Sequence, residues 1–170
     1  MSEIEQPELE ERKYFEEMEK SLGKEIYRKA VDYLKEENFP PPIPTMKDQI
    51  IYFGAPDENT IYQVIGGGGE PGDIVDKVAH QIHELVEISK IKEKIPLVSL
   101  NECLEKYPEV QEKAHQIAKS WEEKFLEKVN KEKLKEEFKN FAEFLKEEKR
   151  RDEKLEKEIE EKVKKMKENL

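Results

Sequence analysis

Cysteine is almost missing from this chain of 170 residues, because Cys103 is the only one. A single cysteine excludes an internal disulfide and a zinc site built on several thiolates. Long hydrophobic runs are missing too. None approaches the roughly 20 residues that span a bilayer, and the first thirty residues lack the apolar segment of a signal peptide. We therefore expect a cytoplasmic protein that does not enter membranes.

Positively charged residues are fewer than negatively charged ones. The chain has 31 Lys and Arg residues against 41 Asp and Glu, which gives a net charge of −10. Neutralising phosphate groups requires a surplus of Lys and Arg, so the composition argues against binding to nucleic acid or to anionic lipid. The expected partners are other copies of the chain and a small molecule that the sequence does not identify.

What the chain does contain is charge: 42% of the residues are charged and 35% are hydrophobic. This balance is typical of long solvated helices. The charged residues are mainly Glu and Lys, and Asn and Gln are scarce, which resembles proteins from heat-loving organisms. Apolar residues recur every three or four positions over most of the chain. The fold class we predict is mainly α, a helical bundle.

Prolines, glycines and capping residues divide the predicted helices. A helix is expected over residues 2–37, with Gly23 as a point where it can break or kink, and the proline-rich segment 40–44 must end it. Further helices are predicted over 74–92, from Ser99 to about Pro108, and from Glu109 onward. We expect a helical domain over 1–145 and a charged helical tail over 146–170.

One β-hairpin is predicted within the bundle, at about residues 49–65. The runs 49–53 and 60–65 are rich in β-branched and aromatic residues, and the segment 54–59 between them has turn chemistry of hairpin length. The glycines 66–69 that follow are expected to form a flexible joint.

Self-association is expected from two features. The hairpin leaves an unpaired strand edge. In the tail the apolar residues thin to Leu155, Ile159, Val163 and Met166, at spacings of four, four and three. Such a stripe belongs either to a coiled-coil-like helix with a partner or to a solvated helix held by Glu/Lys pairs. We predict a homo-oligomer.

All three histidines lie in two predicted helices. On the first, Asp76, His80, His83 and Glu87 fall within about 40° of one another at 100° per residue, with Glu84 beside them. On the second, Glu112 and His115 are three residues apart, and Glu122 lies two turns further on the same side. Imidazole and carboxylate groups that converge from rigid elements are what a divalent transition metal requires.

The sequence therefore predicts a metal site, with zinc, iron, manganese or nickel as the ion. We expect the metal ligands to be His80, His83, Glu87 and His115, and we expect Glu84 and Glu112 to act as a catalytic base or as further ligands. Metal-assisted hydrolysis is the reaction class that fits best if the chain is an enzyme. Against this, the apolar face of the first helix is centred away from the histidines, which can simply be solvated.

Carboxylates alone give a second interpretation. Glu84-x-x-Glu87 is followed by Glu109-x-x-Glu112 on the next long helix. This resembles the magnesium-binding pattern of the all-α nucleotide pyrophosphohydrolases of the MazG and dimeric dUTPase kind. The resemblance implies that these four glutamates hold Mg²⁺ against the phosphates of a nucleoside triphosphate. The chain departs from the pattern at Glu112, where the family has Asp.

A third interpretation needs no active site. A chain this rich in Glu and Lys can serve as an interaction or scaffold protein whose charged tail is the working part. The sequence does not decide between this role and an enzyme.

Overall fold

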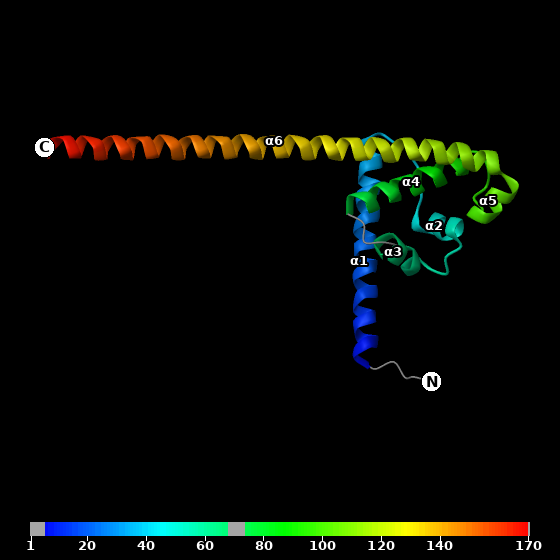
Figure 1. Ribbon diagram of the computed structural model, residues 1–170. Helices are drawn as coiled ribbons and strands as arrows, with labels where there is room; N and C mark the ends of the chain where they lie inside the picture. The colour runs from blue at the N-terminus through cyan, green and yellow to red at the C-terminus, as the bar shows by residue number, and fades with distance from the viewer. Residues whose placement is uncertain (1–5, 68–73, 170) are drawn as a thin grey trace. The chain divides into compact units, whose positions relative to one another are not determined.

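The computed structural model describes residues 6–67 and 74–169, which form six helices and no strand (Figure 1). These helices are α1 (Gln6–Glu36), α2 (Met46–Phe53), α3 (Glu58–Gly67), α4 (Ile74–Lys92), α5 (Leu100–Lys106) and α6 (Pro108–Glu168). The prediction of a mainly α fold is confirmed. The chain divides into two units, Met1–Glu127 and Lys128–Leu170, and α6 contributes residues to both.

The core of the first unit is built around α4, which is covered on more than one side. One cluster joins apolar residues of α1, α4 and α6: Ile26, Ala30, Leu34, Val78, Ile82, Leu85, Val86 and Ala118. A second cluster brings α2, α5 and α6 to the rest of α4: Tyr52, Ile88, Ile91, Cys103 and Ala114. Each fully buried Ile or Leu side chain stabilises the fold by about 1.5–3 kcal/mol. Because α4 is enclosed in this way, polar residues on it are buried as well, among them Gln81, His83 and Glu87.

The predicted β-hairpin at about 49–65 is wrong, because this segment forms α2 and α3. Its turn-type residues act as helix caps. Thr45 and Asp48 form a capping box at the start of α2, Gly54 ends that helix in the left-handed conformation, and Asp57 accepts a hydrogen bond from the Thr60 backbone N–H (2.8 Å) at the start of α3. The buried residues of α2 recur every three positions, which is helical spacing. Capping and burial therefore outweigh the β-propensity of Ile50 and Ile51.

Two glycines allow α1 and α3 to pack with their backbones in contact. A Cβ on Gly23 of α1 would lie 1.9 Å from the carbonyl oxygen of Tyr62, and a Cβ on Gly66 of α3 would lie 1.9 Å from that of Glu19. The helix α1 continues through Gly23, so the expected break there is absent. Gly66 and Gly67 belong to the last turn of α3 rather than to a flexible joint, whereas residues 68 and 69 lie outside the described part of the chain.

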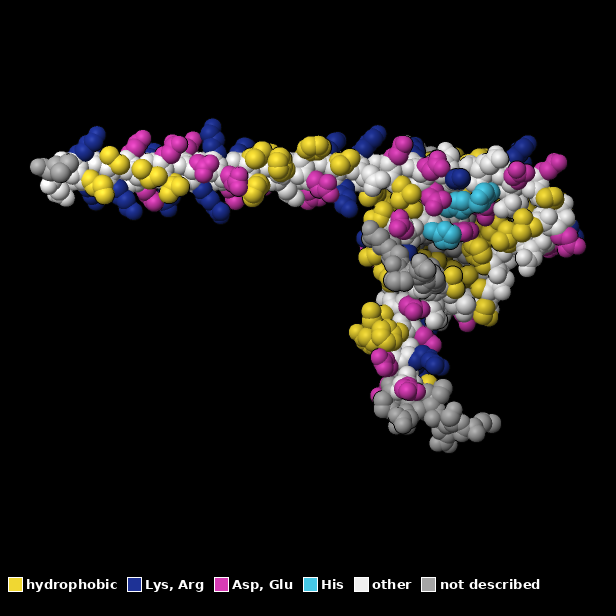
Figure 2. All heavy atoms as spheres, viewed as in Figure 1, with side chains coloured by type: hydrophobic (Ala, Val, Ile, Leu, Met, Phe, Trp, Pro, Cys, Tyr) yellow, Lys and Arg dark blue, Asp and Glu magenta, His cyan; other side chains and the backbone are white. Residues whose placement is uncertain are grey.

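Within the second unit, α6 runs through residues 145 and 146 without a break. Nine large hydrophobic side chains of this part of α6 are between 44% and 72% exposed: Leu134, Phe138, Phe141, Phe144, Leu145, Leu155, Ile159, Val163 and Met166. We call these nine residues the tail stripe, and Figure 2 shows hydrophobic side chains along α6 among charged ones. Among the described helices, none combines the length and the apolar character that a bilayer span requires.

Candidate metal centre

Three side chains from α4 and α6 converge on one point. α4 supplies His83 and Glu87, one turn apart, and α6 supplies His115. Glu87 Oε1 lies 2.9 Å from His115 Nδ1 and 3.7 Å from His83 Nε2, and the two ring nitrogens are 3.1 Å apart. A tetrahedral zinc ion with bonds of about 2.0–2.1 Å sets its ligand atoms roughly 3.3–3.4 Å apart. These three atoms therefore match the spacing of metal ligands to within a few tenths of an ångström, and the group can hold a metal ion.

The imidazole of His83 is fixed through its second nitrogen. Nδ1 lies 2.9 Å from Glu122 Oε2 and donates its hydrogen to that carboxylate. Nε2 thereby faces Glu87 and His115. Metal-bound histidines usually donate their other ring N–H to a carboxylate, a backbone carbonyl or a water molecule, because this bond fixes the tautomer and makes the ligand more basic.

The carboxylate of Glu87 is oriented in a similar way. The hydroxyl of Tyr52 donates a hydrogen bond to Oε2 (2.7 Å), and Gln111 Nε2 donates one to Oε1 (3.4 Å). Burial and the bond to Glu87 raise the pKa of Tyr52 well above its usual range, so the hydroxyl stays a donor. The carboxylate, with its side chain only 5% exposed, thus keeps Oε1 directed at the two histidines.

The charges of the cluster follow from these contacts. Burial acts to raise the pKa of Glu87, but hydrogen bonds from His83, Tyr52 and His115 outweigh it and lower that pKa. The carboxylates of Glu87 and Glu122 outweigh burial at His83 and raise its pKa. The lowered pKa favours the ionised form of Glu87, and the raised pKa of His83 means that a cation competes with a proton for this imidazole.

Glu84 and His80 lie beside this three-atom group. Burial and the nearby charge of Glu87 raise the pKa of Glu84 to about 7. His80 Nε2 lies 3.3 Å from Glu84 Oε1, and the His80 side chain is 72% exposed. Its ring is parallel to that of His83, with the two ring centroids 6.3 Å apart. His80 thus lies beside the cluster and contacts Glu84.

A cavity of about 450 Å³ opens over the cluster. The residues that line it come from α2, α4, α5 and α6: Phe53, His80, His83, Glu84, Glu87, Leu100, Gln111, His115, Lys119 and Glu122. Three of them are carboxylates and one is a lysine, so the cavity favours a cation. Figure 2 shows histidine side chains among acidic ones on this unit's surface.

The structure brings together only part of the predicted site. Of the expected ligands, His83, Glu87 and His115 converge, whereas His80 is exposed beside them. Glu84 lines the cavity. Glu112 is exposed on α6 and, like Glu109, is not among the residues that line the cavity.

Two residues of the site, Tyr52 and Gln111, were missed by sequence reasoning. Tyr52 was assigned to a strand, although its spacing from Met46 and Gln49 is helical. Gln111 lies four residues, about one turn, before His115 on the same predicted helix, and this spacing is the signal that could have found it.

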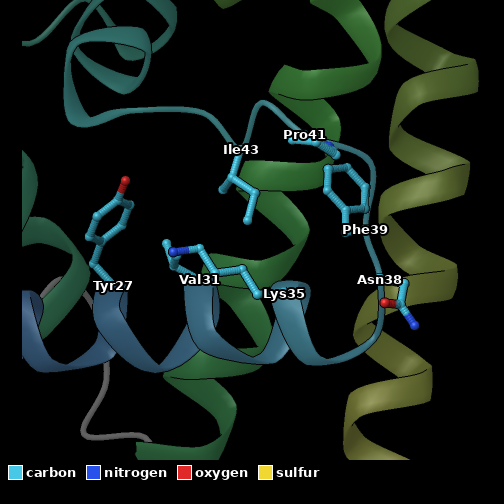
Figure 3. Close-up of a pocket in the computed structure, with 7 residues that line it drawn as sticks. All are labelled: Tyr27, Val31, Lys35, Asn38, Phe39, Pro41 and Ile43. Atoms are coloured by element: carbon cyan, nitrogen blue, oxygen red, sulfur yellow. The ribbon is translucent and has the colours of Figure 1, made fainter.

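A separate cavity of about 490 Å³ lies between α1 and the segment that follows it (Figure 3). The side chains of Tyr27, Val31 and Lys35 rise from α1 toward Ile43, and Phe39 and Pro41 complete the lining together with Asn38. This lining contains no histidine and no carboxylate, so it offers no metal ligand of the kind found at the α4–α6 cluster.

Comparison with models of known protein families, with curated proteins and with solved structures found no match to this chain. The functional argument therefore depends on the geometry of the cluster.

Proposed function

We propose that the protein binds one divalent transition-metal ion through His83 Nε2, Glu87 Oε1 and His115 Nδ1. The observation that carries this proposal is the pairing at His83, whose Nδ1 contacts Glu122 while Nε2 faces two other potential ligands. A carboxylate on one ring nitrogen leaves the other nitrogen directed at Glu87 and His115, which is the arrangement that metal-binding histidines have. Two imidazoles with one carboxylate favour zinc, iron, manganese or nickel over magnesium.

We further propose that the ion serves in hydrolysis. Three protein ligands leave at least one coordination position open, as in catalytic zinc sites. The His115 side chain is 52% exposed and the cavity opens to solvent, so water and a substrate can reach the ion. A bound divalent ion lowers the pKa of its water ligand to about 7. Glu84, whose pKa is also raised to about 7, is placed to take up the proton.

Calorimetric titration tests the metal proposal. Protein prepared without a histidine tag is stripped with a chelator and titrated with zinc. We expect one equivalent to bind, and we expect His83→Ala or His115→Ala to weaken binding by more than about 100-fold. His80→Ala is the matched control, with an expected change below about three-fold. Equal losses of zinc affinity in all three variants would contradict the proposal, because zinc binding would then not depend specifically on His83 and His115. Circular dichroism checks that each variant keeps its helix content.

The magnesium interpretation stays a prediction, and it requires four carboxylates around one ion. Glu84 and Glu87 line the cavity, whereas Glu109 and Glu112 are exposed on α6. Release of pyrophosphate from a nucleoside triphosphate with Mg²⁺, lost in Glu109→Gln but kept in His115→Ala, would support it over the transition-metal site.

A second function is supported by an independent observation, the exposed tail stripe. We propose that the tail stripe pairs with the same segment of a second copy. Leu134, Phe138, Phe141 and Leu145 follow the four, three, four spacing of a coiled coil, and each is about half exposed or more. A soluble helix rarely leaves such a row in water unless it has a partner.

A further inference from the structure

A larger cavity, of about 770 Å³, adjoins the metal centre. Its lining comes from α2, α3, α4 and the turn between α2 and α3: Gln49, Phe53, Gly54, Ala55, Pro56, Thr60, Ile61, Val64, Ile65, Asp76, Lys77, His80, Gln81 and Glu84. This volume lies within the range of about 300–1,000 Å³ that is typical of small-molecule sites. Phe53, His80 and Glu84 line both cavities, so a molecule in the larger one reaches the metal centre at these residues.

The two sides of this cavity differ in character. Side chains from α2, α3 and the turn are mostly apolar, whereas α4 and α2 contribute two buried carboxamides. Gln81 Nε2 donates a hydrogen bond to Gln49 Oε1 (3.0 Å), and Gln49 Nε2 donates one to Met46 Sδ (3.3 Å). The exposed fractions of Gln81 and Gln49 are 2% and 1%. A buried amide pair beside apolar side chains is the kind of group that fixes the orientation of a ligand.

Gln81 retains unused hydrogen-bonding capacity. No hydrogen bond to its Oε1 comes from the described residues, and this atom is not among the side-chain atoms that are fully buried without a partner, so it stays accessible from the cavity that Gln81 lines. A carboxamide offers an acceptor and a donor side by side, which matches the C=O and N–H edge of a lactam, imide or cyclic urea.

The charges around the cavity argue against an anionic ligand. Lys77 is the only lysine or arginine among the described residues that line it, and Lys77 Nζ donates a hydrogen bond to the carbonyl oxygen of Gly66 (2.6 Å) in the last turn of α3. Asp76 and Glu84 add negative charge. These charges disfavour an anion, and the apolar side chains of α2, α3 and the turn favour an uncharged molecule.

We propose that this cavity is the substrate pocket of the metal centre and takes an uncharged, planar ring compound with a lactam-type edge, which Gln81 recognises. The pocket holds the part of the substrate that does not react, and the remainder extends past Glu84 toward His83 and His115. The assignment of a substrate rests on the proposed hydrolytic function, whereas binding of the ring does not.

Two probes that differ in one donor test this proposal. 2-Pyridone has the adjacent C=O and N–H, and N-methyl-2-pyridone lacks the N–H. Binding to the full chain is followed by the side-chain amide resonances in ¹⁵N NMR spectra. We expect 2-pyridone to shift the Gln81 and Gln49 signals in a saturable way and to bind about ten-fold more tightly than the methylated probe. Equal binding of the two probes, or no binding of either, would overturn the proposal.

Variants locate the interaction. Gln81→Met keeps the length of the side chain and is expected to remove the preference between the probes, whereas Gln116→Met on the exposed part of α6 is expected to keep it. Val64 lines the cavity but is 60% exposed, so Val64→Trp can fill the cavity without entering the core, and it is expected to abolish binding of 2-pyridone. A preference that survives in Gln81→Met, or 2-pyridone affinity unchanged in Val64→Trp, would contradict the assignment.

Zinc titrations of the same samples separate the two proposals. If zinc binds at the cluster but the probes do not bind as expected, the pocket assignment fails and the metal site stands. If 2-pyridone binds with the expected preference but zinc does not bind, the metal proposal fails and the cavity remains a binding site for ring compounds.

Discussion

His83 determines how the cluster is arranged, because each of its two ring nitrogens has a different partner. Glu122 fixes one nitrogen, and the other faces Glu87 and His115. Glu122 therefore acts as a positioning residue: it touches His83 and leaves the three potential ligand atoms untouched.

Replacement of Glu122 by Gln is expected to weaken zinc binding by about 10- to 100-fold, because the imidazole loses the carboxylate that orients it. The matched control is Glu123→Gln, since Glu123 is exposed at the next position of α6 and should leave the affinity unchanged. Competition with a chromophoric chelator measures both affinities. If Glu122→Gln binds zinc as tightly as the unchanged protein, the orienting role is excluded.

The raised pKa of His83 makes zinc affinity depend on pH. In the metal-free protein, protonation of His83 stabilises the fold fully below about pH 6.5, and this contribution is lost as the pH rises through the higher folded-state pKa. Zinc needs the neutral imidazole, so its affinity is expected to rise by up to about ten-fold per pH unit until that pKa is passed, and then to level off. Chelator competition between pH 6 and 8.5 measures this slope, and an affinity that stays constant over the range would contradict it.

At the scale of the helices, the sequence predicted α4 and α6 well, because their apolar residues recur with helical spacing over many turns. It failed for residues 49–65, where two short helices contain β-branched and aromatic residues. The decisive features there were the capping interactions of Thr45, Asp48, Gly54 and Asp57, which are equally compatible with turns in the sequence alone. The error also removed Tyr52 from the predicted site.

The close packing of α1 and α3 predicts that replacing a helical glycine by alanine lowers the stability of the protein, the reverse of the usual effect. At an exposed helical position, Gly→Ala stabilises a protein by about 0.5–1 kcal/mol. At Gly23 the added methyl group meets the Tyr62 carbonyl oxygen, so Gly23→Ala is expected to destabilise the protein by about 1–3 kcal/mol. Urea denaturation measures the free energy of unfolding. Ser21→Ala, at an exposed position of α1, is the control and should be neutral or slightly stabilising.

At the scale of the whole chain, the site could be predicted only in part. The burial of its residues on α4 depends on several other helices that pack against α4. The apolar face of α4 correctly indicated one contact surface, and the histidines appeared to lie on its flank. His83 and Glu87 are nevertheless buried, since α2 supplies Tyr52 and α6 supplies His115 and Glu122 on that flank. Which elements cover a second face is a tertiary property that periodicity within a single helix does not contain.

The tail stripe gives a prediction about assembly. Phe141→Glu places a charge in the row of exposed hydrophobic residues and is expected to shift the chain from a dimer or larger oligomer to a monomer, because a buried charge opposes coiled-coil pairing. Asn140→Glu adds the same charge at the neighbouring position, outside the stripe, and should not. Sedimentation velocity measures the mass of both variants. A monomeric unchanged protein at all concentrations would exclude self-pairing.

The central claim is that His83, Glu87 and His115 hold one metal ion, and X-ray absorption spectroscopy of zinc-loaded, untagged protein tests it most directly. We predict one zinc per chain with two imidazole nitrogens and an oxygen-rich remainder at about 2.0–2.1 Å, and loss of imidazole scattering in the His83→Ala/His115→Ala double variant. A zinc environment of oxygen atoms alone, or the same imidazole signal in the double variant, would contradict the claim.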